Sequence, residues 1–529
     1  MNIYLFGMIV SIAVFVIISV VVSRKIKGAE DFYVAGRKAP VLLIAGSMIA
    51  SYASTGLFMG DAATCYDGGF AAIVLFAGMQ SAGYIVGAVF FGRYLRRSGA
   101  MTIPEFFGKR FHSVTLRKVA AITAIITMIV YLLSVIQGVG TLMAYVTGLS
   151  YNTCIIIAAV AFTFISIVSG SKGVLITDTM MAAIFTIAMI IATFVIAKNA
   201  GGWYDTVSSM AANPETAGFF SWTGKPGALY DNGIENMIWG LVYGVVWMSV
   251  CAIGPWQASR YQMAKNENTI VHSAVYAALG VFIVEFLAGI AAVMVNNVNP
   301  GMADSSHVLI WAATNLMPKV LGVVLLTGIL SAGISSGTTF LSLVGASFAN
   351  DIVGASEEKT VRVSRITMFI VSAVVLALGL LNSPAIFWVM YLGGAIIASS
   401  WMPVCFGAIF SRKMTKTAAI AGMIIGFVTC FGMKMCTAIG GIEFPAYFDP
   451  SLVGMVANVI ILIVVSSMTK VTGDEKAERE ALFIMPNNEY NEIQMDKSLK
   501  YAKQGLIVAA LVSALIIIAW VIPYMKGVM

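Results

Sequence analysis

A run of small and hydroxylated residues interrupts an apolar stretch in the second half of the chain. Residues 331–339 have the sequence SAGISSGTT, in which Ala332, Ser335, Ser336 and Thr339 are spaced to lie on one face of a helix. Hydroxyl groups and free backbone carbonyls can replace the hydration shell of a hard monovalent cation without burying a formal charge. The pattern predicts a cation site, although such hydroxyls also commonly bond back to the carbonyls of their own helix.

Several acidic residues lie within apolar stretches of the chain. Carboxylates at membrane depth are costly and usually act as ion ligands or proton carriers, which makes Asp178 and Glu285 candidates for either role. Asp178 lies near the end of its stretch, where it could instead cap the helix or reach the surface. Glu285 could equally be a buried acid paired with a neighbouring hydroxyl. Asp61 and Asp67 lie toward the outer end of a stretch and are expected to line a vestibule or cap a helix.

Two of the helices that must position these groups contain interruptions. Residues 50–56 (ASYASTG) place small and hydroxylated residues where a helix should be apolar, and residues 252–255 (AIGP) end in a proline that removes a backbone donor. Unwinding at such points frees carbonyls that need partners inside the protein. Close helix packing through small residues and a simple proline kink are the alternatives.

The composition places these features in a membrane. The 529 residues are 59% hydrophobic and 11% charged, with a mean hydropathy of +0.90. This apolar content is higher than the core of a soluble protein requires. A spanning helix needs about 20 mostly apolar residues. About fourteen such stretches follow one another, near residues 3–23, 41–69, 71–96, 115–147, 152–169, 176–198, 233–258, 269–297, 319–351, 362–381, 385–411, 416–438, 450–468 and 504–524.

The two interruptions open two blocks of five predicted spans each. Interrupted helices at matching places in two halves are typical of inverted-repeat transporters, whose site lies at the bilayer midplane. This pattern predicts an N-terminal extra helix and basic loop (1–40), a first repeat (41–198), an extracellular loop (199–232), a second repeat (233–411) and C-terminal helices with a cytoplasmic loop at 469–503 (412–529).

The basic residues set the expected orientation. All but five of the 32 Lys and Arg residues lie in alternate connections or in the helix ends beside them. The positive-inside rule places these connections in the cytoplasm and both termini outside a plasma or inner membrane. The net charge of +7 is explained by contact with anionic lipid, so we expect no nucleic-acid partner.

Other classes of protein fit the sequence less well. The six cysteines occur singly and the three histidines are scattered, so we expect no catalytic residues, no cofactor and no enzyme activity. A channel would show a repeated filter or charged rings. We expect a monomeric transporter of a small solute, with a solute sensor on a transporter fold as the alternative from another class.

Two segments resemble signature regions of the sodium:solute symporter family. They are DFYVAGR at 31–37 and TIPEFFGKRF at 102–111, and together with the serine-rich 331–339 they cover most of the chain in the family's order. The resemblance implies an all-α polytopic membrane protein with the leucine-transporter fold. This fold is a five-plus-five inverted repeat, here preceded by one extra helix and followed by three.

The resemblance also implies the ion sites. The conserved sodium site of the family joins carbonyls of the first core helix to a carbonyl and two hydroxyls of the eighth, which match Ala50, Ala53, Ala332, Ser335 and Ser336. Some members hold a second sodium, which here would use Asp178, Ser335, Thr338 and Thr339, with threonines where serines are more usual. Sodium is therefore the expected coupling ion and the only expected metal, and proton coupling through Asp178 or Glu285 is the alternative.

The sequence says least about the identity of the transported solute. The segments from 45–46 to 66–68 and from 131–134 to 138–140 most resemble the acetate-type members, so a monocarboxylate such as acetate or pyruvate is expected, with pantothenate, proline, a sugar or sialic acid as alternatives. We expect no Arg or Lys deep in the core spans, so an anion would use helix N-termini and hydroxyl or amide donors. Interhelical hydrogen bonding is the other use of polar residues at these depths. The candidate solute contacts are Ser54, Thr55, Gln80, Tyr131, Gln137, Trp247 and Gln257.

Overall fold

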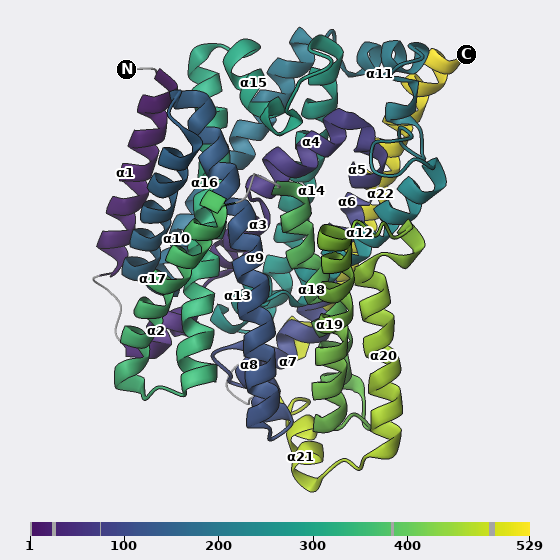
Figure 1. Ribbon diagram of the computed structural model, residues 1–529. Helices are drawn as coiled ribbons and strands as arrows, with labels where there is room; N and C mark the ends of the chain where they lie inside the picture. The colour runs from purple at the N-terminus through teal and green to yellow at the C-terminus, as the bar shows by residue number, and fades with distance from the viewer. Residues whose placement is uncertain (1–2, 24–27, 75, 382–385, 486–491) are drawn as a thin grey trace.

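The computed structural model describes residues 3–23, 28–74, 76–381, 386–485 and 492–529, and this part of the chain is almost entirely helical. No strand occurs in it beyond an isolated bridge between Ala39 and Ala264. Figure 1 shows the long helices running side by side, with both termini at one end of the molecule and α2, α8 and α21 at the other.

The N-terminal half begins with one helix outside the core and continues through the region predicted as the first repeat. Its elements are α1 (Ile3–Ser23), α2 (Gly28–Val34), α3 (Val41–Tyr52), the π-helical η2 (Gly56–Asp61), α4 (Ala62–Thr64), η3 (Cys65–Gly69), α5 (Phe70–Val74), α6 (Ala77–Gly87), η4 (Ala88–Gly92), α7 (Arg93–Arg97), α8 (Ile103–Arg110), α9 (Val114–Thr147) and α10 (Tyr151–Asn199).

The second half of the chain is also helical. It comprises α11 (Trp203–Ala212), η5 (Ala217–Phe220), α12 (Gly233–Ile253), α13 (Pro255–Met263), α14 (Glu267–Val298), η6 (Ser305–His307), α15 (Val308–Asn315), α16 (Lys319–Ser347), η7 (Phe348–Val353), α17 (Glu357–Leu381), α18 (Ile386–Phe410), α19 (Lys416–Gly440), η8 (Ala446–Phe448), α20 (Pro450–Met468), α21 (Gly473–Ala481) and α22 (Glu492–Val528).

The number of membrane spans is close to the expected one. In the described residues, 12 helices are long and apolar enough to cross a membrane, or up to 13 when the bent pair Val41–Tyr52 and Gly56–Val74 counts as one. The span predicted at 71–96 corresponds to a shorter run, because α6, η4 and α7 start at Ala77 and end in an Arg-rich turn. The cytoplasmic loop predicted at 469–503 contains α21, which begins with a capping box formed by Thr472 and Glu475.

The first break lies where α3 ends. Ala53 leaves the helix with φ −66° and ψ 107°, and the segments on either side of the break are bent by 44°. The Ala53 amide still donates to the Ile49 carbonyl at 3.0 Å. The last carbonyls of a helix have no partner in the next turn, so those from Ala50 onward are available to a ligand or a neighbouring helix.

The second break separates α12 from α13. Gly254 has an extended ψ of 139°, and Pro255 occupies the first turn of α13, where its missing N–H costs nothing. A Cβ at position 254 would collide with the Val250 carbonyl. Both predicted interruptions are therefore real breaks in the backbone.

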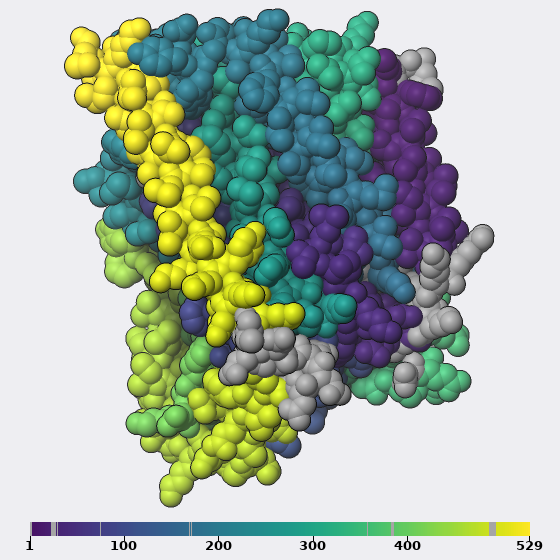
Figure 2. All heavy atoms as spheres, turned by 180° about the vertical axis from the view of Figure 1, so that it is seen from behind, coloured from purple at the N-terminus to yellow at the C-terminus, as the bar shows by residue number. Residues whose placement is uncertain are grey.

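The two breaks lie in the packed centre of the molecule. The central helices α10 and α16 pack against each other, and α3 packs against α10, α14 and α16. Helix α22 lies on the outside, along α11 and α14, where it presents apolar side chains such as Leu511 and Leu515 (Figure 2). An apolar surface of this kind suits contact with lipid.

Candidate functional site

The hydroxyl face of α16 is fully buried. Ser335 and Ser336 are 0% exposed, and within the described residues neither hydroxyl forms a hydrogen bond of ordinary geometry, although Ser335 lies beside the Asp178 carboxylate. Ser331 behaves differently, because its hydroxyl bonds back to the Thr327 carbonyl at 2.6 Å. Leaving two buried hydroxyls without partners is costly. The alternative of simple back-bonding thus accounts for Ser331 but not for Ser335 and Ser336.

Helix α16 packs against the break that follows α3. A Cβ at Gly333 would lie 3.1 Å from Thr55 Cγ2 and would also press on Val139, so only glycine allows the helix to approach the break this closely. The two segments that were predicted to form the first sodium site, around Ala50 and Ala53 and around Ala332, Ser335 and Ser336, therefore belong to helices that contact each other.

Asp178 lies in a dense polar cluster. Arg260 Nη2 donates to Asp178 Oδ2 and to Thr339 Oγ1, both at 2.9 Å. The Ser47 hydroxyl donates to Asp178 Oδ2 at 2.7 Å and accepts a hydrogen bond from Arg260 Nε at 2.9 Å. Asp178, Ser47 and Arg260 are at most 1% exposed. A guanidinium therefore already occupies a position between two of the oxygens predicted to hold a second sodium.

The expectation that no Arg or Lys lies deep in the core is wrong. The predicted span ended at residue 258, which assigned Arg260 to a cytoplasmic connection. In the structure α13 continues to Met263 and is completely buried, so its arginine reaches Asp178. The proline at the first turn of α13 was the sequence feature that could have indicated this second helix.

Thr338, the remaining member of the predicted second sodium site, bonds back to the Ser335 carbonyl at 3.0 Å. Ser335 itself was predicted to be a ligand in both sodium sites. Ser47, which the sequence analysis missed, lies on α3 one turn before Ser51, and the Ser51 hydroxyl donates to the Ser47 carbonyl at 2.5 Å.

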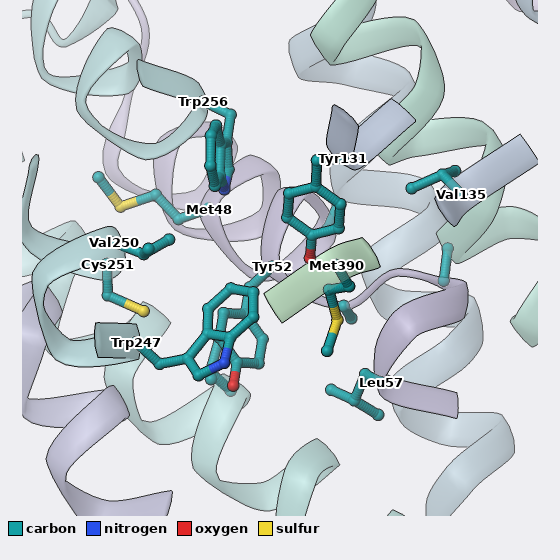
Figure 3. Packing of buried hydrophobic residues seen from close by; sticks show 14 of the residues in the cluster. Met48, Tyr52, Leu57, Tyr131, Val135, Trp247, Val250, Cys251, Trp256 and Met390 are labelled. Atoms are coloured by element: carbon teal, nitrogen blue, oxygen red, sulfur yellow. The ribbon is translucent and has the colours of Figure 1, made fainter. Parts of the chain in front are cut away.

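Several of the predicted solute contacts meet on the other side of the α3 break. The hydroxyls of Ser54 and Tyr131 lie 3.2 Å apart, and the Tyr131 ring is 6.0 Å from that of Trp247 and 5.3 Å from that of Trp256. Figure 3 shows these aromatic side chains gathered with Tyr52 around the break. This group of rings forms a buried aromatic cluster on α3, α9, α12 and α13.

Gln80 joins this cluster through Tyr52, a residue that the sequence analysis missed. The Tyr52 hydroxyl bonds to Gln80 Oε1 and lies 3.2 Å from Glu285 Oε2, and its ring is 5.7 Å from that of Trp247. The amide nitrogen of Gln80 and the indole nitrogen of Trp247 have no partner in the described part of the chain. These two donors are available to a ligand.

The other predicted solute contacts lie in different surroundings. Thr55 donates to the Val135 carbonyl at 3.2 Å and faces α16, so it belongs to the packing of the break. Gln257 is 0% exposed, and neither of its amide atoms has a partner among the described residues. Gln137 is buried on α9.

Two buried acids lie beside the aromatic cluster. Tyr243 donates to Asp61 Oδ1 at 2.6 Å, and Tyr52 contacts Glu285. Asp61 is only 4% exposed, which corrects its expected place in a vestibule or at a helix cap. Asp67 remains at the surface, where it accepts a hydrogen bond from Ser305.

A family model confirms what the two signature segments indicated. The model of the sodium:solute symporter family matches residues 32–426, which is well over half of the chain. The chain belongs to the sodium:solute symporter family. This membership supports symport of a solute with sodium as the coupling ion and identifies the protein as a transporter.

Solved structures confirm the leucine-transporter fold. The symporter is similar to a sodium-coupled sialic acid symporter in a substrate-bound outward-open state, with a TM-score of 0.73 and 16% identity over 89% of this chain and 98% of that one. It is also similar to a nucleobase-cation-symport-1 family transporter in a closed conformation, with a TM-score of 0.54 and 10% identity over 85% of this chain and 98% of that one. At these identities the likeness shows the fold alone.

Proposed function

We propose that this symporter moves a small organic solute into the cell with one sodium ion by alternating access. The observation that supports the proposal is the pair of buried hydroxyls, Ser335 and Ser336, which form no hydrogen bond of ordinary geometry with the described residues, on the helix that packs against the α3 break. Together with the carbonyls of Ala50, Ala53 and Ala332 they would supply the oxygens that sodium requires.

Sodium bound at this site would hold α3 against α16. Entering from outside, it would favour the outward-open form and complete the neighbouring solute site, and closure would follow when both are bound. Loosening of the contact between α3 and α16 in the inward form would then release the ion. One positive charge moving inward through 100 mV gains about 2.3 kcal/mol, roughly fiftyfold in accumulation.

The proposal of one ion rests on Arg260. A second sodium at Asp178, Ser335, Thr338 and Thr339 would have to displace the guanidinium from Asp178 and Thr339. Arg260 already places a positive charge beside the Asp178 carboxylate, so the negative charge of this site is balanced without a second ion.

We propose that the end with α2, α8 and α21 faces the cytoplasm of a cell that holds the symporter in its plasma or inner membrane. Helices α7, α8 and α21, which carry Arg96, Arg110 and Arg479, lie toward this end, opposite the termini (Figure 1). The repeat boundaries at 41–198 and 233–411 and the monomeric state are parts of the same proposal.

The monocarboxylate expected from the sequence is one candidate solute. The donors without partners, Gln80 Nε2 and Trp247 Nε1, could bind a carboxylate group. Proton coupling through Glu285 is the second candidate mechanism, because this carboxylate lies beside the same cluster.

Uptake into proteoliposomes tests the proposal. Labelled acetate, pyruvate, pantothenate, proline, a sugar and sialic acid would be offered with an inward sodium gradient and with potassium in place of sodium. We expect sodium-dependent uptake of a solute by the wild type and by the control Ser331→Ala, whose hydroxyl bonds to its own helix, and its loss in Ser335→Ala/Ser336→Ala. Sodium-independent uptake that follows a pH gradient, or an unaffected double variant, would refute the ion site.

A further inference from the structure

Among the buried acids of the described residues, two sets contrast. Asp178, Glu267 and Asp351 each pair with an arginine, with closest distances of 2.9, 2.5 and 2.8 Å. Asp61 and Glu285 are as deeply buried, at 4% and 2% exposed, yet no Lys or Arg of the described residues pairs with either carboxylate. Their closest partners are the hydroxyls of Tyr243 and Tyr52. Buried carboxylates without a counter-charge are costly, so a site of this kind takes up either a proton or a positive charge from a ligand.

Polar atoms without partners indicate where that charge would bind. Glu285 Oε1, an acceptor, has no hydrogen-bond partner in the described part of the chain and suits a cationic group. The amide nitrogen of Gln80, which is 0% exposed, also has no partner there, and as a donor it suits an acceptor atom of the same solute. The Tyr52 hydroxyl contacts both Gln80 Oε1 and Glu285 Oε2, so the free atoms of these two side chains lie around one hydroxyl group. Helix α14, which carries Glu285, packs against both α3 and α6. The acids thus adjoin the region where the proposed function places the solute.

Aromatic rings surround this position. The ring of Trp247 lies 5.7 Å from that of Tyr52 and 6.0 Å from that of Tyr243, and the Tyr243 ring is 5.1 Å from that of Trp239 (Figure 3 shows Tyr52 and Trp247). A small hard ion prefers a shell of oxygens, as on α16. An organic ammonium group instead gains from carboxylates and aromatic faces together.

We propose that the solute of this symporter carries a cationic nitrogen, a protonated or quaternary amine, which Asp61 and Glu285 bind within the rings of Tyr52, Tyr243 and Trp247. The inference rests on the proposed function, because it places the solute beside the α3 break. A solute that bears a carboxylate would therefore also need a cationic nitrogen. A bare monocarboxylate would meet two buried carboxylates, whereas a solute with a cationic nitrogen would neutralise at least one of them.

A matched set of compounds tests the charge requirement. Choline, glycine betaine and isobutylamine carry a cationic nitrogen, while 3,3-dimethyl-1-butanol is the neutral carbon counterpart of choline, and acetate and pyruvate are bare anions. Thermal stabilisation of the purified full-length protein by each compound in sodium chloride would be measured, followed by sodium-driven uptake of any compound that stabilises it. We expect at least one cationic compound to stabilise the protein and be taken up, and the neutral and anionic compounds to have no effect.

Charge-removing variants locate the effect. Glu285→Gln keeps an acceptor for Tyr52 and should bind the cationic compound at least about tenfold more weakly, while Asp67→Asn, at the exposed end of the same segment as Asp61, should bind it as the wild type does. Stabilisation of Glu285→Gln by sodium alone would show that the variant is folded.

Three outcomes would overturn the inference. They are stabilisation by acetate or pyruvate alone, an unchanged affinity in Glu285→Gln, and a panel in which no cationic compound has any effect. Sodium-dependent uptake of acetate or pyruvate would leave the proposed function intact while refuting the cationic solute. Loss of sodium dependence for every compound would instead refute the proposed function.

Discussion

The two polar regions beside the α3 break differ in how their charges are balanced. On one side, Asp178 has Arg260, Ser47 and Thr339 around it within one buried network. On the other, Asp61 and Glu285 have tyrosine hydroxyls and aromatic rings but no basic partner among the described residues. The first region balances its charge without a ligand, although Asp178 Oδ1 and the Ser335 hydroxyl form no hydrogen bond of ordinary geometry among the described residues. The second region has no charge balance of its own. A buried charge that the protein balances itself serves structure, whereas one that it leaves unbalanced indicates where a ligand binds.

Removing one partner of the balanced pair should have the largest effect. Arg260→Gln leaves the Asp178 carboxylate buried without its counter-charge, and we expect a loss of about 3–5 kcal/mol in the free energy of unfolding. Thermal or denaturant unfolding in detergent would measure it. The double variant Asp178→Asn/Arg260→Gln should recover much of the loss, and equal destabilisation of the single and double variants would contradict a paired network.

Closer packing at the break offers a second test. Gly333→Ala adds a methyl group that presses on Val139 of α9 and lies 3.1 Å from Thr55 Cγ2, and we expect weaker sodium binding because α16 must move away from the break. A tenfold or smaller rise in the sodium concentration needed for half-maximal uptake, about 1.4 kcal/mol, is the expected range. The control Gly432→Ala, where a Cβ meets nothing within 4 Å, should leave the sodium dependence unchanged.

The unbalanced acids should respond in the opposite sense to the balanced pair. Without solute, we expect Glu285→Gln to leave the free energy of unfolding unchanged or to raise it by at most about 1 kcal/mol, because it removes a buried charge that has no counter-charge. Asp178→Asn should lower it, because Arg260 then lacks its partner. Destabilisation of similar size in both variants would mean that the two regions do not differ as described.

The sequence predicted the parts of the fold that depend on local pattern. Apolar length, the AIGP and ASYASTG interruptions and the spacing of Ser335 and Ser336 are all properties of short segments, and the breaks and the buried hydroxyl face follow from them. The Arg260–Asp178 pair could not be predicted in this way, because its partners are 82 positions apart and meet only when α13 turns inward.

The solute region was predicted only in part for the same reason. Ser54, Tyr131, Gln80 and Trp247 are polar or aromatic residues in conspicuous places, and the structure brings them to one cluster. Tyr52 lies within the ASYASTG interruption without being a predicted solute contact, and Tyr243 has no unusual feature in the sequence. Their importance comes from contacts with Glu285 and Asp61, which lie on helices far away along the chain.

Sodium binding to the purified protein tests the central claim most directly. Unfolding temperature would be measured against sodium and against potassium for the wild type, Ser336→Ala and Ser331→Ala, without solute. A specific ion site predicts that sodium but not potassium stabilises the wild type and Ser331→Ala, by about 2.7 kcal/mol at a hundred times the dissociation constant, and that Ser336→Ala loses this response. An identical sodium response in Ser336→Ala would contradict the site between α3 and α16.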